Sequence, residues 1–212
     1  MSTTIAGVEV PETAATAAAT AFALEHTSQL IYDHSRRVFL FGSLRAAQLG
    51  LRPDPELLYV ASLMHDTGLF TPYSREIQRF EVDGADHARA LLLQNGFDTT
   101  AADVVWKAIA LHTSPGIPSR MGPEIAATTY GVLLDALGIG LDDLDAAVVD
   151  EVVATHPRGD FKKGFLQAFV DGLADRPDTA YGTINADVLA RFVPGYQRGS
   201  MVDRVLGSAW VA

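Results

Sequence analysis

The chain contains no cysteine, so neither disulfide bonds nor thiolate chemistry can contribute to its fold or its activity. A metal ion bound to this protein would have to be held by histidine and carboxylate side chains. A chain without disulfides is also typical of the reducing cytoplasm, which is the location that we expect. The N-terminus lacks a basic segment followed by an apolar run, so the sequence predicts no signal peptide.

Positive charge is scarce, because 16 lysine and arginine residues face 26 aspartate and glutamate residues and give a formal net charge of −10. This balance argues against a protein that binds nucleic acid, because such binding depends on lysine and arginine at the phosphates. No apolar run approaches the roughly 18–20 residues of a membrane span, so we expect no membrane-spanning segment. We expect a small-molecule substrate as the partner, and the sequence leaves open whether the chain forms a homo-oligomer.

Alternating apolar and polar residues, which are typical of strands, are also missing, whereas apolar residues recur at helical spacing in seven or more segments. The pattern predicts an all-α fold built as a single domain over residues 1–212. Its core is expected at about 30–190, with a peripheral arm (1–11) and a peripheral tail (after 194). The expected helices lie at about 12–27, 33–50, 55–66, 83–95, 99–112, 123–137, 142–156, 161–173 and 186–192. A loop is expected at 69–80.

The stretch from Leu58 to Gly68 is the most informative part of the sequence. It begins shortly after Asp54, which can cap a helix, and its apolar residues leave hardly any polar face, so we expect a helix buried on most sides. This helix nevertheless ends in His65 and Asp66, and burying an unpaired carboxylate is costly. A bound cation would explain the arrangement. The plainer alternative is a His-Asp pair that faces water at the end of a helix.

Two further residues fit the same chemistry. His34 is expected at the start of a helix, next to Asp33. Asp135 lies within an otherwise apolar segment, where a carboxylate is unfavourable without a partner. Two imidazoles and two carboxylates would bind a borderline divalent ion such as Zn²⁺, Mn²⁺ or Fe²⁺ and leave positions open for water. Asp135 could instead face solvent near the C-terminus of its helix, and these residues alone do not decide between the two interpretations.

His34, then His65 with Asp66, and then Asp135 form an ordered pattern that resembles the HD superfamily of metal-dependent hydrolases. Five stretches also resemble the cyanamide hydratase branch of that superfamily, at 34–39, 58–66, 80–84, 108–112 and 161–169. The resemblance covers roughly residues 30–190 and implies a helical bundle with a central metal site. It implies that the four residues hold one metal ion, with Zn²⁺ as the first choice and Fe²⁺ or Mn²⁺ as alternatives.

The activity implied by this branch is the hydration of a small nitrile such as cyanamide, to urea, by a metal-activated hydroxide. His87 and His112 would lie near the open metal positions, where either could donate a proton, because an ordinary histidine titrates near neutral pH. Each could instead be a core histidine that bonds a backbone carbonyl. Asp66 would act in catalysis as a metal ligand. The residues expected to form a tight substrate pocket are Leu63, Phe70, Trp106 and Thr113.

Two other activities stay open. One is a phosphohydrolase that acts on a nucleotide or a small phosphomonoester, which would need arginine or lysine near the metal. The available arginines are Arg36, Arg37, Arg75 and Arg79. The other is a dinuclear iron oxygenase, because the four metal residues together with His87 and His112 also resemble the six-ligand pattern of two-iron members of the superfamily. A non-enzymatic role is favoured least, because the ligand set looks complete.

Overall fold

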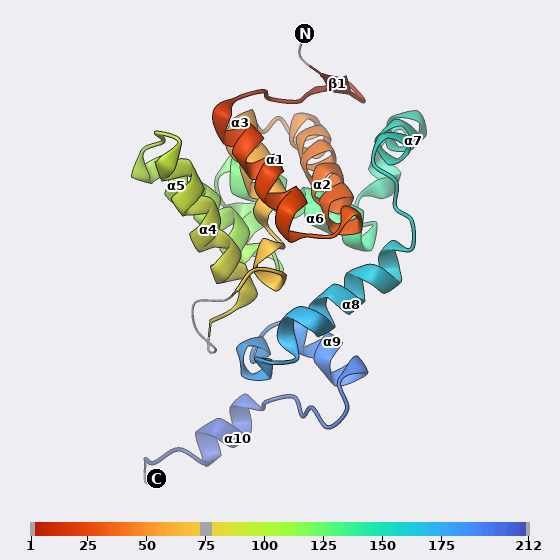
Figure 1. Ribbon diagram of the computed structural model, residues 1–212. Coiled ribbons are helices and arrows are strands. Elements are labelled where there is room, and N and C mark those ends of the chain that lie inside the picture. Colours follow the sequence, from red (N-terminus) through yellow and green to blue (C-terminus); the bar gives the residue numbers. More distant parts are fainter. Residues whose placement is uncertain (1–2, 73–77, 211–212) are drawn as a thin grey trace.

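Ten α-helices make up most of the computed structural model, which describes residues 3–72 and 78–210 (Figure 1). The helices are α1 (Ala14–His26), α2 (Gln29–Gln48), α3 (Pro55–Met64), α4 (Phe80–Gln94), α5 (Thr99–Leu111), α6 (Pro123–Leu137), α7 (Ala146–Thr155), α8 (Phe161–Leu173), α9 (Asn185–Phe192) and α10 (Met201–Leu206). Four short 3-10 helices lie at Thr67–Leu69, Pro118–Arg120, Leu141–Asp143 and Pro177–Ala180. The predicted all-α, single-domain fold is confirmed.

Two helices begin earlier than the sequence predicts. α2 begins at Gln29 instead of near residue 33, because the hydroxyl of Ser28 accepts a 3.3 Å hydrogen bond from the backbone N–H of Ile31 and caps the helix. His34 therefore lies in the second turn of α2 and does not open it. α4 begins at Phe80 instead of near residue 83.

The N-terminal arm, for which the sequence predicts no strand, contains a short hairpin. β1 (Thr4–Ile5) and β2 (Val8–Glu9) pair in antiparallel fashion. Ile5 is buried, and the backbone N–H of Ala6 donates a 2.6 Å hydrogen bond to Oε1 of Glu151 in α7. Strands of two residues are too short to show an alternating pattern, so this hairpin was not predictable from the periodicity of the residues.

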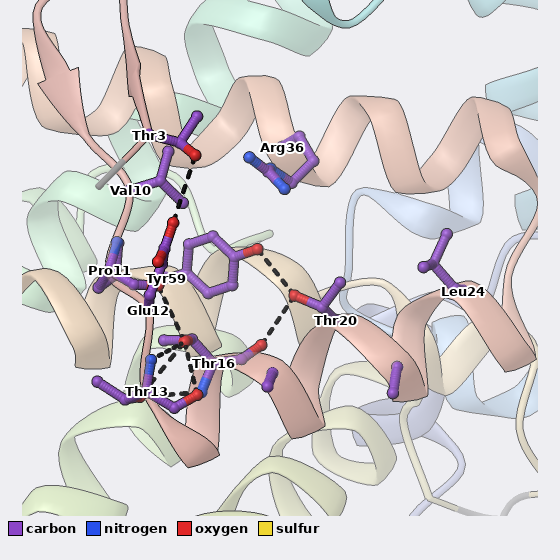
Figure 2. A pocket seen from close by; sticks show the side chains of 12 residues that line it. Thr3, Val10, Pro11, Glu12, Thr13, Thr16, Thr20, Leu24, Arg36 and Tyr59 are labelled. Atoms are coloured by element: carbon purple, nitrogen blue, oxygen red, sulfur yellow. Dashed lines mark hydrogen bonds between the residues drawn. The ribbon is translucent and has the colours of Figure 1, made fainter. Parts of the chain in front are cut away.

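α3 is buried along nearly its whole length, as its apolar sequence predicts. Every residue from Leu57 to Met64 is buried, and the side chain of Asp54 caps the helix by accepting hydrogen bonds from two backbone N–H groups of the first turn. α1 covers one side of α3, where the hydroxyls of Thr20 and Tyr59 hydrogen-bond at 2.8 Å (Figure 2). The chain that leaves the C-terminal end of α3 is therefore still inside the protein.

α2 and α6 approach so closely that both need glycine at the contact. A Cβ on Gly131 would lie 2.1 Å from the carbonyl oxygen of Val38, and a Cβ on Gly42 would lie 2.6 Å from the carbonyl oxygen of Ala127. No side chain fits at such distances. This approach allows polar side chains on the buried faces of α2 and α6 to meet in the core.

The C-terminal helices add a second apolar cluster to the domain. α8 and α9 contribute Phe169, Leu173 and Leu189 to this cluster, and they pack against Leu69 and Phe80. α10 lies apart from helices α1–α7 (Figure 1), and its apolar side chains are exposed. None of the helices in the described ranges combines the length and the apolar composition needed to cross a bilayer.

Candidate metal centre

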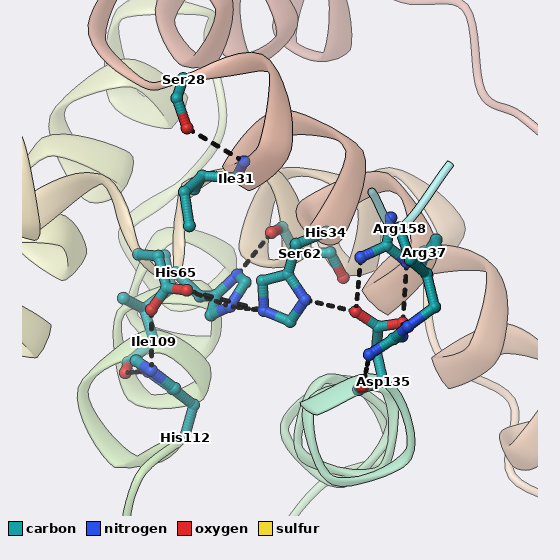
Figure 3. Close-up of polar contacts among 11 residues, drawn as sticks. Ser28, Ile31, His34, Arg37, Ser62, His65, Ile109, His112, Asp135 and Arg158 are labelled. Carbon is teal, nitrogen blue, oxygen red and sulfur yellow. Dashed lines mark hydrogen bonds and ion pairs between the residues drawn. The ribbon is translucent and has the colours of Figure 1, made fainter. Parts of the chain in front are cut away.

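Side chains from α2 and from the end of α3 meet in the core of the domain (Figure 3). His34, His65 and Asp66 each offer one ligand atom, and these atoms all lie within 4.8 Å of one another. Nε2 of His34 lies 3.2 Å from Nε2 of His65, and Oδ2 of Asp66 lies 3.6 Å and 3.1 Å from these two nitrogens. All three residues are buried. This metal group (His34, His65, Asp66) can hold a divalent ion.

Hydrogen bonds on the far side of each ring fix the direction of the two imidazoles. Nδ1 of His34 lies 2.6 Å from Oδ2 of Asp135, and Nδ1 of His65 lies 2.7 Å from the carbonyl oxygen of Ser62 (Figure 3). The ionised carboxylate and the carbonyl only accept hydrogen bonds, so both Nδ1 atoms carry the proton and both Nε2 atoms present a lone pair. Two lone pairs at 3.2 Å repel each other unless a metal ion or a proton lies between them. The donor set therefore fits a metal ion.

Asp66 gives a second, independent indication of a cation. Both of its carboxylate oxygens are buried and lack a hydrogen-bond partner among the described residues. Burial alone would raise the pKa of Asp66, but the imidazoles of His65 and His112 hold the pKa well below its ordinary value, so the carboxylate is charged at neutral pH. A buried carboxylate is stabilised only when a positive charge neutralises it.

The two imidazoles differ in their protonation. Burial lowers the pKa of His34 in spite of the neighbouring carboxylates, which favours the neutral form that binds metals. Burial acts in the same direction on His65, but the charge of Asp66 outweighs it and raises the pKa. A metal ion that binds Nε2 of His65 must therefore compete with a proton at low pH.

Asp135 lies on the opposite side of His34 from the metal group. Its carboxylate accepts hydrogen bonds from Nδ1 of His34 (2.6 Å), from Nε of Arg37 (2.8 Å) and from Nη1 of Arg158. Burial alone would raise the pKa of Asp135, but the bonds to His34 and Arg37 hold it far below its ordinary value. In this arrangement Asp135 orients the imidazole of His34, as second-sphere carboxylates do at metal sites. A direct bond from Asp135 to the metal stays a prediction.

The contribution of the two arginines was not foreseen from the sequence. Arg37 is fully buried and also donates to the backbone carbonyls of His156 and Pro157. Arg158 comes from the segment between α7 and α8, is partly exposed, and donates to the carboxylate and the backbone carbonyl of Asp135. The sequence feature that could have indicated the role of Arg37 is its position one helical turn after His34, which places both residues on the same face of α2.

His112 lies at the site, as predicted. It follows α5, and its Nε2 lies 3.5 Å from Oδ1 of Asp66. Its Nδ1 donates a 2.6 Å hydrogen bond to the carbonyl oxygen of Ile109, which leaves the lone pair of Nε2 on the side of Asp66. In the structure His112 bonds a backbone carbonyl and also lies beside the metal group, and its role as a proton donor stays a prediction.

His87 does not lie with the metal group. Its Nδ1 lies 3.3 Å from Oγ1 of Thr71, and its ring centroid lies 5.7 Å from that of Phe22 in α1. The helical face of α4 that carries His87 therefore points toward α1. The sequence places His87 on a helix near the site but does not show which way the side chain points.

A cavity of about 410 Å³ opens beside the metal group. His65, Asp66, His112 and Thr113 line one end of it, and a contact between Thr113 and the substrate stays a prediction. The remaining wall is mainly apolar and comes from α6, α8 and α9. Among the described residues that line this cavity, none is a lysine or an arginine.

Phe70 and Trp106, expected to line the substrate pocket, are not brought to this cavity. Nε1 of Trp106 donates a 2.7 Å hydrogen bond to Oδ1 of the exposed Asp86, so the indole lies between α4 and α5 near the surface. Phe70 packs against the second apolar cluster, and Leu63 is enclosed in the core around α3. The expectation of a tight pocket formed by these side chains is corrected, since helices distant in sequence supply the wall instead.

The described arginines that were considered for a phosphate site already contact other side chains of the protein. Arg36 donates to the hydroxyl of Tyr32, and Arg37 is paired with Asp135. Arg79 donates a 2.8 Å hydrogen bond to Glu81 and lines a smaller, neighbouring cavity. Arg75, within the predicted loop, lies outside the described residues.

The site combines an all-helical domain, a buried His-His-Asp group that could hold a metal ion, and a cavity beside that group. Residues 31–155 match the HD domain family, and this segment contains all four residues of the ordered pattern. The match covers more than half of the chain, which therefore belongs to the HD domain family of metal-dependent hydrolases. A comparison with curated proteins gives no significant match.

Proposed function

We propose that this protein adds water to an uncharged small molecule held in the cavity beside the metal group. The observation that carries the proposal is that Nε2 of His34, Nε2 of His65 and the buried carboxylate of Asp66, which has no hydrogen-bond partner among the described residues, lie together as three ligand atoms. A divalent ion held by these residues would lower the pKa of a water ligand to about 7 and would so supply hydroxide at neutral pH. Zn²⁺ is our first choice, because catalytic zinc sites use such nitrogen and oxygen ligands and keep a position open, with Fe²⁺ and Mn²⁺ as alternatives.

His112 is suited to move the proton in this reaction. The bond from its Nδ1 to the carbonyl of Ile109 holds the ring, and its Nε2 lies on the cavity side near Asp66. A histidine with one nitrogen free can accept a proton from water and return it to the substrate around neutral pH. The apolar wall beyond His112 would keep bulk water away from the reacting atoms.

The substrate that we propose first is a nitrile such as cyanamide, which would be converted to urea. Hydroxide adds to the nitrile carbon, the nitrile nitrogen gains a proton from His112, and tautomerisation gives the amide, so that one water molecule is consumed and nothing leaves. A neutral substrate agrees with the cavity lining, which contains no lysine or arginine among the described residues. The similarity of five stretches to the cyanamide hydratase branch supports the same choice.

The two alternative activities have less support from the site. A phosphate group would be expected to contact arginine or lysine, and the described arginines nearest to the site are engaged with Asp135 or Glu81. A two-iron site would use His87, whose Nδ1 instead contacts Thr71.

The test is to incubate the purified, zinc-loaded protein with cyanamide and to measure urea. We expect metal-dependent urea formation that stops on chelation, returns on reloading and is lost in Asp66→Ala. A panel of phosphomonoesters and nucleotides serves as the comparison. Phosphate release without nitrile hydration would overturn the proposed reaction in favour of the phosphohydrolase.

A further inference from the structure

The cavity beside the metal group is much larger than cyanamide. Its volume is about 410 Å³, whereas the three heavy atoms of cyanamide occupy on the order of two water molecules, each with about 30 Å³ in the liquid. The part of the wall that lies on α6 and α8 includes Leu133, Phe165 and Phe169. A molecule as small as cyanamide would leave this apolar surface in contact with water, which is unfavourable.

Two buried polar atoms belong to residues on the same wall and lack a hydrogen-bond partner among the described residues. They are Oδ1 of Asn185, at the start of α9, and Oγ1 of Thr129, on α6. The two residues are only 2% and 3% exposed. Native proteins rarely leave such atoms unpaired, so Oδ1 of Asn185 and Oγ1 of Thr129 are candidates to bind a polar group of a ligand.

The amide of Asn185 has only one possible orientation. Its Nδ2 donates a 3.0 Å hydrogen bond to Oε1 of Glu81. The carboxylate of Glu81 also accepts hydrogen bonds from Arg79 (2.8 Å) and from the hydroxyl of Thr113. A carboxylate paired with an arginine is ionised and only accepts, so the amino group of Asn185 must face it. Oδ1 is therefore the atom of Asn185 that is left to accept a hydrogen bond from a ligand.

We propose that the substrate has an apolar body of several carbons and an N–H group, next to the reacting group, that donates to Oδ1 of Asn185. This inference rests on the proposed function. Among nitriles, an N-alkylcyanamide combines these features, and its hydration is R–NH–C≡N + H₂O → R–NH–CO–NH₂. The water oxygen bonds to the nitrile carbon and two protons end on the former nitrile nitrogen, without a leaving group or a change in redox state. The alkyl group fills the apolar part of the cavity.

The first test uses the products of this reaction, so that it does not depend on turnover. Binding of urea, propylurea and hexylurea to the zinc-loaded protein is measured by calorimetry. We expect the affinity to rise by about fourfold for each methylene that is buried. In Ala136→Phe, which fills the cavity wall on α6, hexylurea should lose affinity while urea does not. Ala90→Phe is the matched control, because Ala90 is exposed on α4.

The second test isolates the N–H group. An N-alkylurea, R–NH–CO–NH₂, is compared with the carboxamide of equal length, R–CH₂–CO–NH₂. In the wild type we expect the urea to bind roughly tenfold more tightly, the scale of one buried hydrogen bond, and in Asn185→Ala the ratio should fall to near one. Asn185→Ser replaces this variant if it does not fold, since a serine hydroxyl can still donate to Glu81. Asn95→Ala, at the end of α4, is the control that should keep the ratio.

The two proposals fail in different ways. Alkylureas that bind as described while no nitrile is hydrated would support the inference and overturn the proposed reaction. Affinity that does not depend on chain length, or a urea preference that persists in both Asn185 variants, would overturn the inference even if cyanamide is hydrated.

Discussion

Nδ1 of His34 lies 2.6 Å from Oδ2 of Asp135, and this hydrogen bond directs the opposite nitrogen of the ring toward His65 and Asp66. The same carboxylate is paired with the buried guanidinium of Arg37. The position of the His34 imidazole is therefore set by a network outside the metal group. Metal affinity is expected to depend on this network as well as on the ligands.

The first prediction concerns the role of Asp135. Asp135→Asn should weaken metal affinity by about 10–100-fold, the usual effect of losing a second-sphere partner, because an amide orients the His34 imidazole less strongly than a carboxylate does. Titration against a competing chelator measures the change. Asp103→Asn is the control, since Asp103 pairs with Arg89 at the surface. Unchanged affinity would contradict the role of Asp135, and complete loss of metal would show that Asp135 is itself a ligand.

The second prediction concerns His87 and His112, for which the sequence analysis predicts the same role. His112→Gln should keep the metal and lose about 10²–10⁴-fold in activity, the usual effect of removing a general acid or base. His87→Gln should keep both, because His87 contacts Thr71 and not the metal group. Metal content and urea formation are measured for both variants. A wild type with two ions, one of which is lost in His87→Gln, would move the assignment to the dinuclear oxygenase.

The third prediction is a pH dependence that comes from Glu81. Burial alone would raise the pKa of Glu81, but the hydrogen bond and charge of Arg79, together with Thr113 and His112, lower it. A lowered pKa in the folded state means that the charged carboxylate stabilises the fold above the unfolded value of about 4.3, and that this contribution is lost as the pH falls through the folded value.

Glu81→Gln should therefore lower the melting temperature most near neutral pH, and the difference from the wild type should shrink below about pH 4.3. Thermal unfolding between neutral pH and pH 3 measures this difference. Glu25→Gln, at an exposed position of α1, is the matched control and should show little effect at any pH. A difference for Glu81→Gln that does not change with pH would contradict the account.

The centre of the fold was predictable because its signals are local. The apolar sequence of α3 indicated its burial, and the cap at Asp54 indicated where it begins. Three of the four residues predicted as metal ligands lie together in the metal group, whereas Asp135 contacts the far side of His34. The start of α2 was not predicted correctly. It depends on a single hydrogen bond between the hydroxyl of Ser28 and the backbone N–H of Ile31, and serine is also common outside helix caps.

The substrate cavity was not predictable, because it depends on how distant helices pack. The wall that includes Leu133 and Phe165 forms only when α6 and α8 come together, and the sequence does not encode their relative orientation in a local pattern. Trp106 was an obvious aromatic candidate, but the face of α5 that carries it points to Asp86 at the surface. Asn185 gave no signal, because its role depends on contact with Glu81, 104 residues away.

The central claim is that His34, His65 and Asp66 hold one divalent metal ion. Elemental analysis of the purified wild type and of Asp66→Ala, with circular dichroism to verify folding, tests this most directly. We predict one ion per chain in the wild type and almost none in a folded Asp66→Ala, because removing the anionic ligand leaves the charge of the ion poorly neutralised. Full metal content in Asp66→Ala would contradict the account.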